Sequence, residues 1–227
     1  TTLYQGRSPF SLAEKYGTEY RKTFSNLLHA EVSLALDITN ASLWVEIGSF
    51  LGRSAITTAE AIKKRRADTQ ILCIDPWTGA TGQWIWHAFP SKRPLGYETF
   101  DHLQMDEYGT VRIYERFLAN IVGAGHHDVI VPIRAPSIVG MKLLRRLEQQ
   151  PQVIYLDSAH EADETFLELT VAWALLAPGG LLMGDDFGWE AVRHDLLKFV
   201  ANISTGDEVK GHGGRNPTAG ITVIKGT

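Results

Sequence analysis

Residues 43–54 read LWVEIGSFLGRS, an apolar run that stops at a glycine and passes through a second glycine into polar residues. The segment SAITTAEAIKKRR follows with helical spacing. A second apolar run, ILCID, then ends at Asp75 and is broken by Pro76. A buried strand, a glycine turn, a helix and another buried strand are typical of a parallel sheet wound on both faces.

Short apolar runs and helical segments continue to alternate downstream. The apolar runs predict buried strands at 129–133, 153–157 and 181–186. The segments between and after them predict helices at 138–149, 161–176 and 189–202. The chain then reads EVKG, a glycine-rich turn and GITVIKG, which predicts two final strands paired antiparallel. We therefore expect an α/β fold: a Rossmann-like, doubly wound, mostly parallel sheet with an antiparallel C-terminal strand.

The N-terminal part differs in pattern. Apolar residues recur at helical spacing over residues 9–40, which predicts helices there. We expect a helical cap over residues 1–42 and a Rossmann-like domain over residues 43–227. The cap could cover the site or pair two subunits, so a homo-oligomer is one of two alternatives.

A long connection follows the second strand. Residues 77–125 exceed the usual loop length and carry many aromatic side chains, which are unusual in a solvated linker. We interpret this insertion as a lid or substrate-binding region. Its candidate walls for an acceptor are Trp84, Trp86 and Tyr97.

Composition narrows the class of protein. The 227 residues carry a net charge of −4 with no basic stripe, which argues against nucleic acid as a partner. The single cysteine, Cys73, lies in an apolar run, so no disulfide within the chain is expected. The first ten residues show no apolar signal core, and the longest apolar stretch is too short to span a membrane. These patterns predict a cytoplasmic protein without a membrane partner.

The glycine turn and the second strand end indicate a cofactor site. Gly48 and Gly52 permit a tight turn and close approach of a ligand to the backbone. Asp75 ends the next strand, where a carboxylate can accept hydrogen bonds from a ribose diol. Each signal alone is weak, because glycines at such turns are common for steric reasons. Together they favour a cofactor of the nucleotide type.

Acidic residues end the next pair of strands. Asp157 closes one strand and is followed by His160, and Asp185 and Asp186 close the next. Parallel strand ends lie about 5 Å apart, so these carboxylates would converge, which is costly without a cation or a proton. Hard oxygen ligands suit Mg²⁺ or a similar cation, and His160 could act as a base. The alternative is that Asp157 and Asp186 cap the following helices.

The motifs together resemble a known family. Glu46-x-Gly-x-x-x-Gly with an acid at the second strand end resembles the class I S-adenosylmethionine-dependent methyltransferases. The stretch GSFLGRS with Asp75-Pro-Trp is similar to the metal-dependent macrolide sugar O-methyltransferases and to the cephalosporin hydroxylase-like proteins. The resemblance implies S-adenosylmethionine as the cofactor. It also implies which residues would hold this cofactor: Glu46, Gly48, Ser49, Gly52 and Ser54 at its methionine end, Asp75 at the ribose, and Trp77 and Arg134 to Ser137 at the adenosine. For Trp77, a place in the core is an equal alternative.

The resemblance also bears on the chemistry. Metal-dependent sugar O-methyltransferases show an Asp-x-x-His segment and an acid-Asp pair, which Asp157 to His160 and Asp185-Asp186 match. This implies Mg²⁺ or another hard divalent cation held by Asp157, Asp185 and Asp186, and catalytic roles for Asp157 and His160. The acceptor would be a hydroxylated small molecule. Three alternatives stay open: a metal-independent methyltransferase, an NAD-dependent dehydrogenase and a non-catalytic module.

Overall fold

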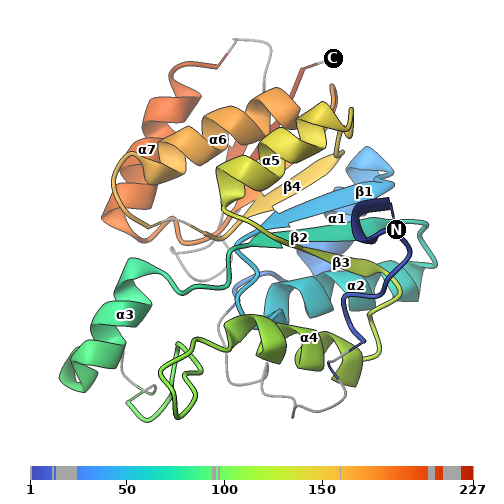
Figure 1. Cartoon of the computed structure of the whole chain (residues 1–227). Coiled ribbons are helices and arrows are strands. Elements are labelled where there is room, and N and C mark those ends of the chain that lie inside the picture. The colour runs from blue at the N-terminus through green and yellow to red at the C-terminus, as the bar shows by residue number, and fades with distance from the viewer. Residues whose placement is uncertain are drawn as a thin grey trace.

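The computed structural model describes residues 2–11, 13, 25–93, 96, 98–158, 160–203, 208–211 and 221–226. Its centre is a seven-stranded sheet in the order β3-β2-β1-β4-β5-β7-β6 (Figure 1). The strands are β1 (Leu43–Ile47), β2 (Gln70–Asp75), β3 (Ile130–Arg134), β4 (Val153–Leu156), β5 (Leu181–Gly184), β6 (Glu208–Gly211) and β7 (Ile221–Ile224).

Strand pairing confirms the expected fold. The first five strands pair in parallel, and β7 pairs antiparallel with both β5 and β6. The strand order reverses at β1, which lies between β2 and β4. In open α/β sheets the crevice at such a reversal, beyond the carboxyl ends of the strands, is where ligands bind. The ends of β1 and β4 are therefore the place to look for a site.

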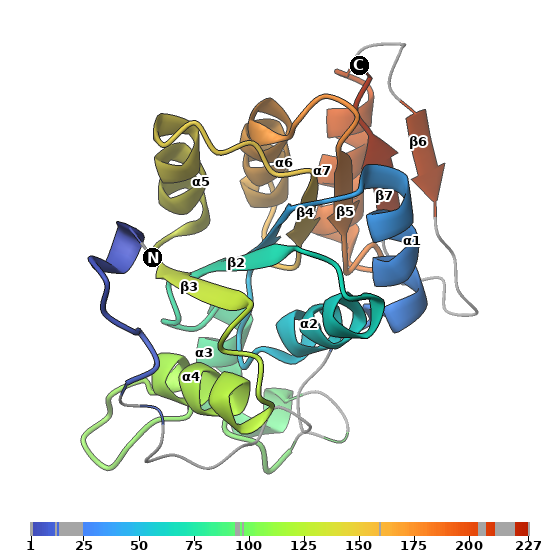
Figure 2. The same cartoon turned by 90° about the vertical axis from the view of Figure 1, so that its right-hand side faces the viewer.

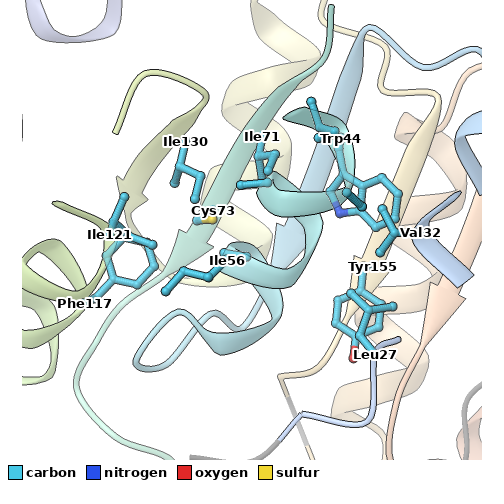
Figure 3. Close-up of a cluster of buried hydrophobic side chains, with 14 of the residues drawn as sticks. Leu27, Val32, Trp44, Ile56, Ile71, Cys73, Phe117, Ile121, Ile130 and Tyr155 are labelled. Atoms are coloured by element: carbon cyan, nitrogen blue, oxygen red, sulfur yellow. The ribbon is translucent and has the colours of Figure 1, made fainter. Parts of the chain in front are cut away.

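Helices cover both faces of the sheet (Figure 2). The helices α1 (His29–Thr39), α2 (Arg53–Arg65) and α4 (Ile113–Gly123) lie on one face, and α5 (Ser137–Arg146), α6 (Glu164–Leu175) and α7 (Glu190–Val200) lie on the other. Alternate residues of each strand point to opposite faces, which gives two apolar layers. Trp44 and Tyr155 belong to the first layer, with Ile56, Phe117 and Cys73 (Figure 3). Cys73 is buried, as predicted.

The N-terminal segment is less helical than expected over residues 9–40. Of the described residues in that range, only His29–Thr39 form an α-helix. Residues 25–28 have no regular structure, although Leu27 is buried in the core. Hydrogen bonds from Asn26 to Asp185, just beyond the far strand β5, hold this stretch, so a tertiary contact overrides the helical spacing. Residues 14–24 lie outside the described part of the chain.

The insertion is also shorter than predicted. The helix α4 falls inside residues 77–125, yet its Phe117 and Ile121 are fully buried against the sheet. This helix is therefore the ordinary crossover between β2 and β3. The chain leaving β2 runs to α3 (Thr81–Ala88), which stands away from the sheet and buries none of its side chains (Figure 1).

Of the candidate acceptor walls, Trp84 is 45% exposed and Trp86 packs on His102, while Tyr97 lies outside the described residues. Among the described residues no helix combines the length and apolarity needed to cross a membrane.

Candidate active site

Gly48 joins the two parts of the site. It follows β1 in a left-handed conformation, with φ of +81°. A Cβ atom on this residue would lie 2.1 Å from the backbone oxygen of Asp157, at the end of β4. Close contact with a backbone, which cannot yield as a flexible side chain can, thus requires glycine here. Steric contact alone explains why residue 48 is glycine. The same contact places the glycine turn directly against the acidic segment at Asp157.

Asp75 fixes the turn from the other side. Its carboxylate accepts hydrogen bonds from the backbone amides of Ser49 (2.9 Å), Phe50 (2.9 Å) and Trp77 (2.5 Å). Phe50 and Trp77 have φ of +44° and +51°, which is a strained conformation for bulky residues. The indole nitrogen of Trp77 also donates to the Phe50 carbonyl oxygen at 2.8 Å. These hydrogen bonds therefore fix the glycine turn and the Trp77 loop in one conformation, although two of their residues are strained.

The Asp75 carboxyl group is buried, which disfavours its charged form. Burial raises the pKa of its carboxyl group, although the amides of Phe50, Trp77 and Ser49 oppose that change. A carboxylate offers about four acceptor positions, and the three amides leave roughly one of them for a ligand.

Glu46 is a fully buried acid near the carboxyl end of β1. The Ser54 hydroxyl, in the first turn of α2, donates to its Oε1 at 2.9 Å. Its Oε2 has no hydrogen-bond partner among the described residues. Burial raises the pKa of Glu46 to about 7, against the effect of hydrogen bonds from serine side chains. An unpaired buried carboxylate oxygen beside the glycine turn can accept a hydrogen bond from a bound ligand.

Asp157, His160 and Asp186 form the acidic cluster. One ligand atom from each lies within 4.8 Å of the others. His160 Nε2 lies 2.5 Å from Asp186 Oδ2, and the Trp189 ring packs on the imidazole at 4.9 Å. Burial, and then the charges of Asp185 and Asp186, raise the pKa of Asp157 well above its usual range. Two carboxylates and an imidazole that converge in this way fit a divalent cation such as Mg²⁺ or Mn²⁺.

Asp185 differs from the expected arrangement. It is buried and does not belong to this group of three converging residues. Four donors surround its carboxylate: the amide nitrogen (3.2 Å) and side chain (2.9 Å) of Asn26, the Tyr155 hydroxyl (2.8 Å) and the amide of Asp186 (2.8 Å). His160, expected as a base, also stands among the candidate ligands.

The family of methyltransferase domains matches residues 45–187, more than half of the chain. The chain belongs to this family. The resemblance to the class I S-adenosylmethionine-dependent methyltransferases is thus confirmed. A comparison with curated protein sequences finds no match.

Solved structures share the fold of this methyltransferase at low sequence identity. An O-methyltransferase from Bacillus cereus in complex with SAH is 13% identical, with a TM-score of 0.61, and the match covers 90% of this chain and 83% of that one. The O-methyltransferase TomG from Streptomyces achromogenes, in complex with SAM, is 15% identical, with a TM-score of 0.59 and coverage of 96% and 90%. A putative caffeoyl-CoA O-methyltransferase from Staphylococcus aureus is 14% identical, with a TM-score of 0.59 and coverage of 99% and 96%.

The remaining expected cofactor residues of the methyltransferase lie at the start of two helices or, for Trp77, in the core. Gly52 precedes α2 with φ of +88°. Ser137 is half-buried and begins α5, next to the end of β3. Trp77 is only 1% exposed and packs against Tyr114 and Phe117, with each ring centroid 4.8 Å away. Its side chain lies in the core, the alternative that the sequence left open.

The capping alternative for the aspartates is wrong. The N-cap of α6 is Asp163 and that of α7 is Trp189, and neither N-cap side chain accepts a capping hydrogen bond. Asp157 and Asp186 therefore serve no capping role. Asn26 and Tyr155 were not predicted as site residues. Asn26 lies in a stretch that reads as helix, and Tyr155 reads as an ordinary strand residue.

Proposed function

We propose that this methyltransferase transfers the methyl group of S-adenosylmethionine to a hydroxyl group of a small molecule, with the help of a divalent cation. One observation carries the proposal: the glycine turn of the cofactor site contacts the backbone of Asp157, the first residue of the acidic cluster. A methyl donor at the turn and an acceptor at the cluster would therefore be neighbours. The SAM and SAH complexes of the structural neighbours support the choice of cofactor.

The cofactor would lie across the ends of β1, β2 and β3. Glu46, with its unpaired Oε2, would face the methionine end together with Gly48, Ser49, Gly52 and Ser54. Asp75 would accept a hydrogen bond from the ribose at its remaining position, and Ser137 would border the adenine. The backbone of Trp77 helps to fix Asp75, while its ring supports the loop from the core.

The acceptor would lie at Asp157, His160 and Asp186, which would hold the cation. When bound, a divalent cation lowers the pKa of a hydroxyl group that it contacts. In the transfer, the hydroxyl oxygen forms a bond to the methyl carbon, the carbon–sulfur bond breaks and the hydroxyl proton leaves to a base. The products are a methyl ether and S-adenosylhomocysteine. Positioning is the main contribution a protein can make to such a displacement.

A second candidate function rests on the short contact between His160 and Asp186. A carboxylate that orients an imidazole equips it to take a proton, as in a metal-independent methyltransferase. In that mechanism His160 is the base and Asp186 its positioning partner. Activity that survives exhaustive chelation would favour this mechanism.

The first test is calorimetry of S-adenosylmethionine binding, followed by turnover of a panel of hydroxylated small molecules with Mg²⁺, Mn²⁺ or chelator. We expect cofactor binding with or without metal, and turnover only with metal. Asp186→Asn should lose turnover at least about 100-fold yet keep cofactor binding. The matched control is Asp163→Asn, since the Asp163 side chain is 75% exposed and pairs with Lys198.

Absence of cofactor binding under every condition would overturn the proposed function. Turnover by Asp186→Asn equal to the wild type would remove the acidic cluster from the chemistry. The small-molecule acceptor, the cytoplasmic location and the assembly state remain predictions.

A further inference from the structure

The N-terminal segment reaches the edge of the acidic cluster through one residue. Asn26 donates from its backbone nitrogen to Asp185 Oδ2 and from its side-chain nitrogen to Asp185 Oδ1. Both carboxylate oxygens are thus held by the same residue, 159 positions away in the sequence. Leu27, the next residue, is buried and belongs to the same apolar layer as Tyr155, which anchors the segment (Figure 3). Tyr155 itself donates to Asp185 Oδ2.

We propose that Asn26 is a positioning residue of the acidic cluster, which holds Asp185 outside the group that binds the cation. This inference rests on the metal-dependent form of the proposed function. Asp185 and Asp186 are neighbours, yet only Asp186 converges with Asp157 and His160. The two Asn26 donors, with Tyr155, account for that difference, because they satisfy the Asp185 carboxylate with hydrogen bonds.

The arrangement has a chemical consequence. A hard divalent cation takes about six ligands, and Mg²⁺ keeps several positions for water or substrate. Three protein ligands leave positions for the oxygen atoms of an acceptor, whereas Asp185 as a fourth ligand would occupy one of them. Asp185 would still attract the cation by its charge from the neighbouring position. The N-terminal segment would therefore help to set how many positions the acceptor finds open.

The test is Mn²⁺ binding, measured by calorimetry and by electron paramagnetic resonance, on the full chain. Asn26→Leu removes the side-chain donor while it keeps the size of the residue. We expect this variant to bind Mn²⁺ about three- to tenfold more tightly, because the freed Asp185 turns toward the cation. Asp186→Asn should weaken binding at least about 100-fold, and Asp185→Asn less than about tenfold. The control Asn202→Leu, at an exposed residue, should bind as the wild type does.

A double-mutant cycle makes the inference specific. In an Asp185→Asn background, Asn26→Leu should no longer change Mn²⁺ affinity, because both residues act through one contact. An Asp185→Asn variant as impaired as Asp186→Asn would overturn the inference, since Asp185 would then be a ligand. So would an Asn26→Leu variant indistinguishable from the wild type.

Hydrogen exchange supplies a readout that needs no metal. Asp185→Leu, which removes the acceptor oxygens, should speed exchange of the Asn26 amide proton at least about tenfold, while the amides of α5 stay unchanged. If the wild type binds no Mn²⁺, the metal-dependent function fails and the role toward the cation fails with it. Unchanged exchange in Asp185→Leu, by contrast, contradicts the Asn26 contact even where Mn²⁺ binds well.

Discussion

The glycine turn with Asp75 and the acidic cluster lie side by side but are stabilised in opposite ways. In the turn, Asp75 accepts three backbone amides, and a loop with two strained residues is held in one shape. In the cluster, Asp157 and Asp186 converge with His160, and the pKa of Asp157 is raised by burial and by its acidic neighbours. The first region is held in its conformation by its own hydrogen bonds, without a ligand. The second region would gain from the cation that we propose for it.

The contrast shows what each region contributes. A cofactor site gains from being preformed, because a rigid loop loses little freedom when the cofactor binds. A metal site holds like charges together, which lowers stability until the cation neutralises them. The four predictions below test this contrast, from the largest effect to the smallest.

The largest effect should come from Gly48→Ala, because Gly48 makes the contact between the two regions. The added methyl group would lie 2.1 Å from the Asp157 backbone oxygen, so β1 and β4 must move apart at their ends. We expect a loss of several kcal/mol in the free energy of unfolding, or failure to fold. Thermal and urea unfolding measure the change.

Gly125→Ala is the matched control for Gly48→Ala. Gly125 also has a positive φ, +74°, but an added methyl group there would meet nothing within 4 Å. It should cost only the backbone strain, about 1 kcal/mol. Equal losses in the two variants would mean that Gly48 does not approach the Asp157 backbone as closely as in the structure.

The second prediction concerns the pH dependence of Glu46. Its pKa rises from an ordinary 4.5 to about 7 in the folded protein, so the folded state binds a proton more readily. The free energy of unfolding must therefore fall as the pH rises from 4.5 to 7, by up to about 3 kcal/mol from this group alone. Glu46→Gln does not titrate in this range and should therefore not lose stability between these pH values at this position.

Urea titrations at about pH 5 and about pH 8, on either side of the raised pKa, test this prediction. The stability of Glu46→Gln relative to the wild type should increase with pH. A difference that is the same at both values would show that Glu46 titrates normally, and that its burial is less complete than in the structure.

The sheet and its helices are predictable because continuous apolar runs identify buried parallel strands, as in ILCID. The site is predictable only in part. The prediction that Asp185 and Asp186 both join Asp157 neglects the donors from Asn26 and Tyr155 that satisfy the Asp185 carboxylate. Asn26 could not be predicted, because its role depends on a contact across the fold. The helix α4 falls within the predicted lid because the whole connection 77–125 is assigned by its length and its aromatic content.

The third prediction compares one substitution at two tryptophans. Trp77→Phe removes the indole hydrogen bond to Phe50 and leaves a gap in the core, so we expect a loss of about 2 kcal/mol in stability. Trp84→Phe, on the exposed helix α3, should change stability by less than about 0.5 kcal/mol. Cofactor affinity should fall with Trp77→Phe, since its ring supports the strained loop. A cofactor affinity unaffected by Trp77→Phe would mean that the loop keeps its shape without the ring.

The fourth prediction applies one chemical change, aspartate to asparagine, to both regions in the presence of chelator. Asp157→Asn removes a charge that burial, Asp185 and Asp186 disfavour, so it should stabilise the protein by about 1 kcal/mol, or a few degrees in Tm. Asp75→Asn should destabilise it by a similar amount, because the new amide group cannot accept all three backbone donors. Addition of Mn²⁺ should raise the Tm of the wild type and of Asp75→Asn, but not that of Asp157→Asn. Opposite signs for the same substitution would establish that charge repulsion dominates in the acidic cluster, whereas the backbone hydrogen bonds to Asp75 dominate in the turn. Equal signs would mean that the two regions are stabilised alike, and that the cluster needs no cation to offset its charge.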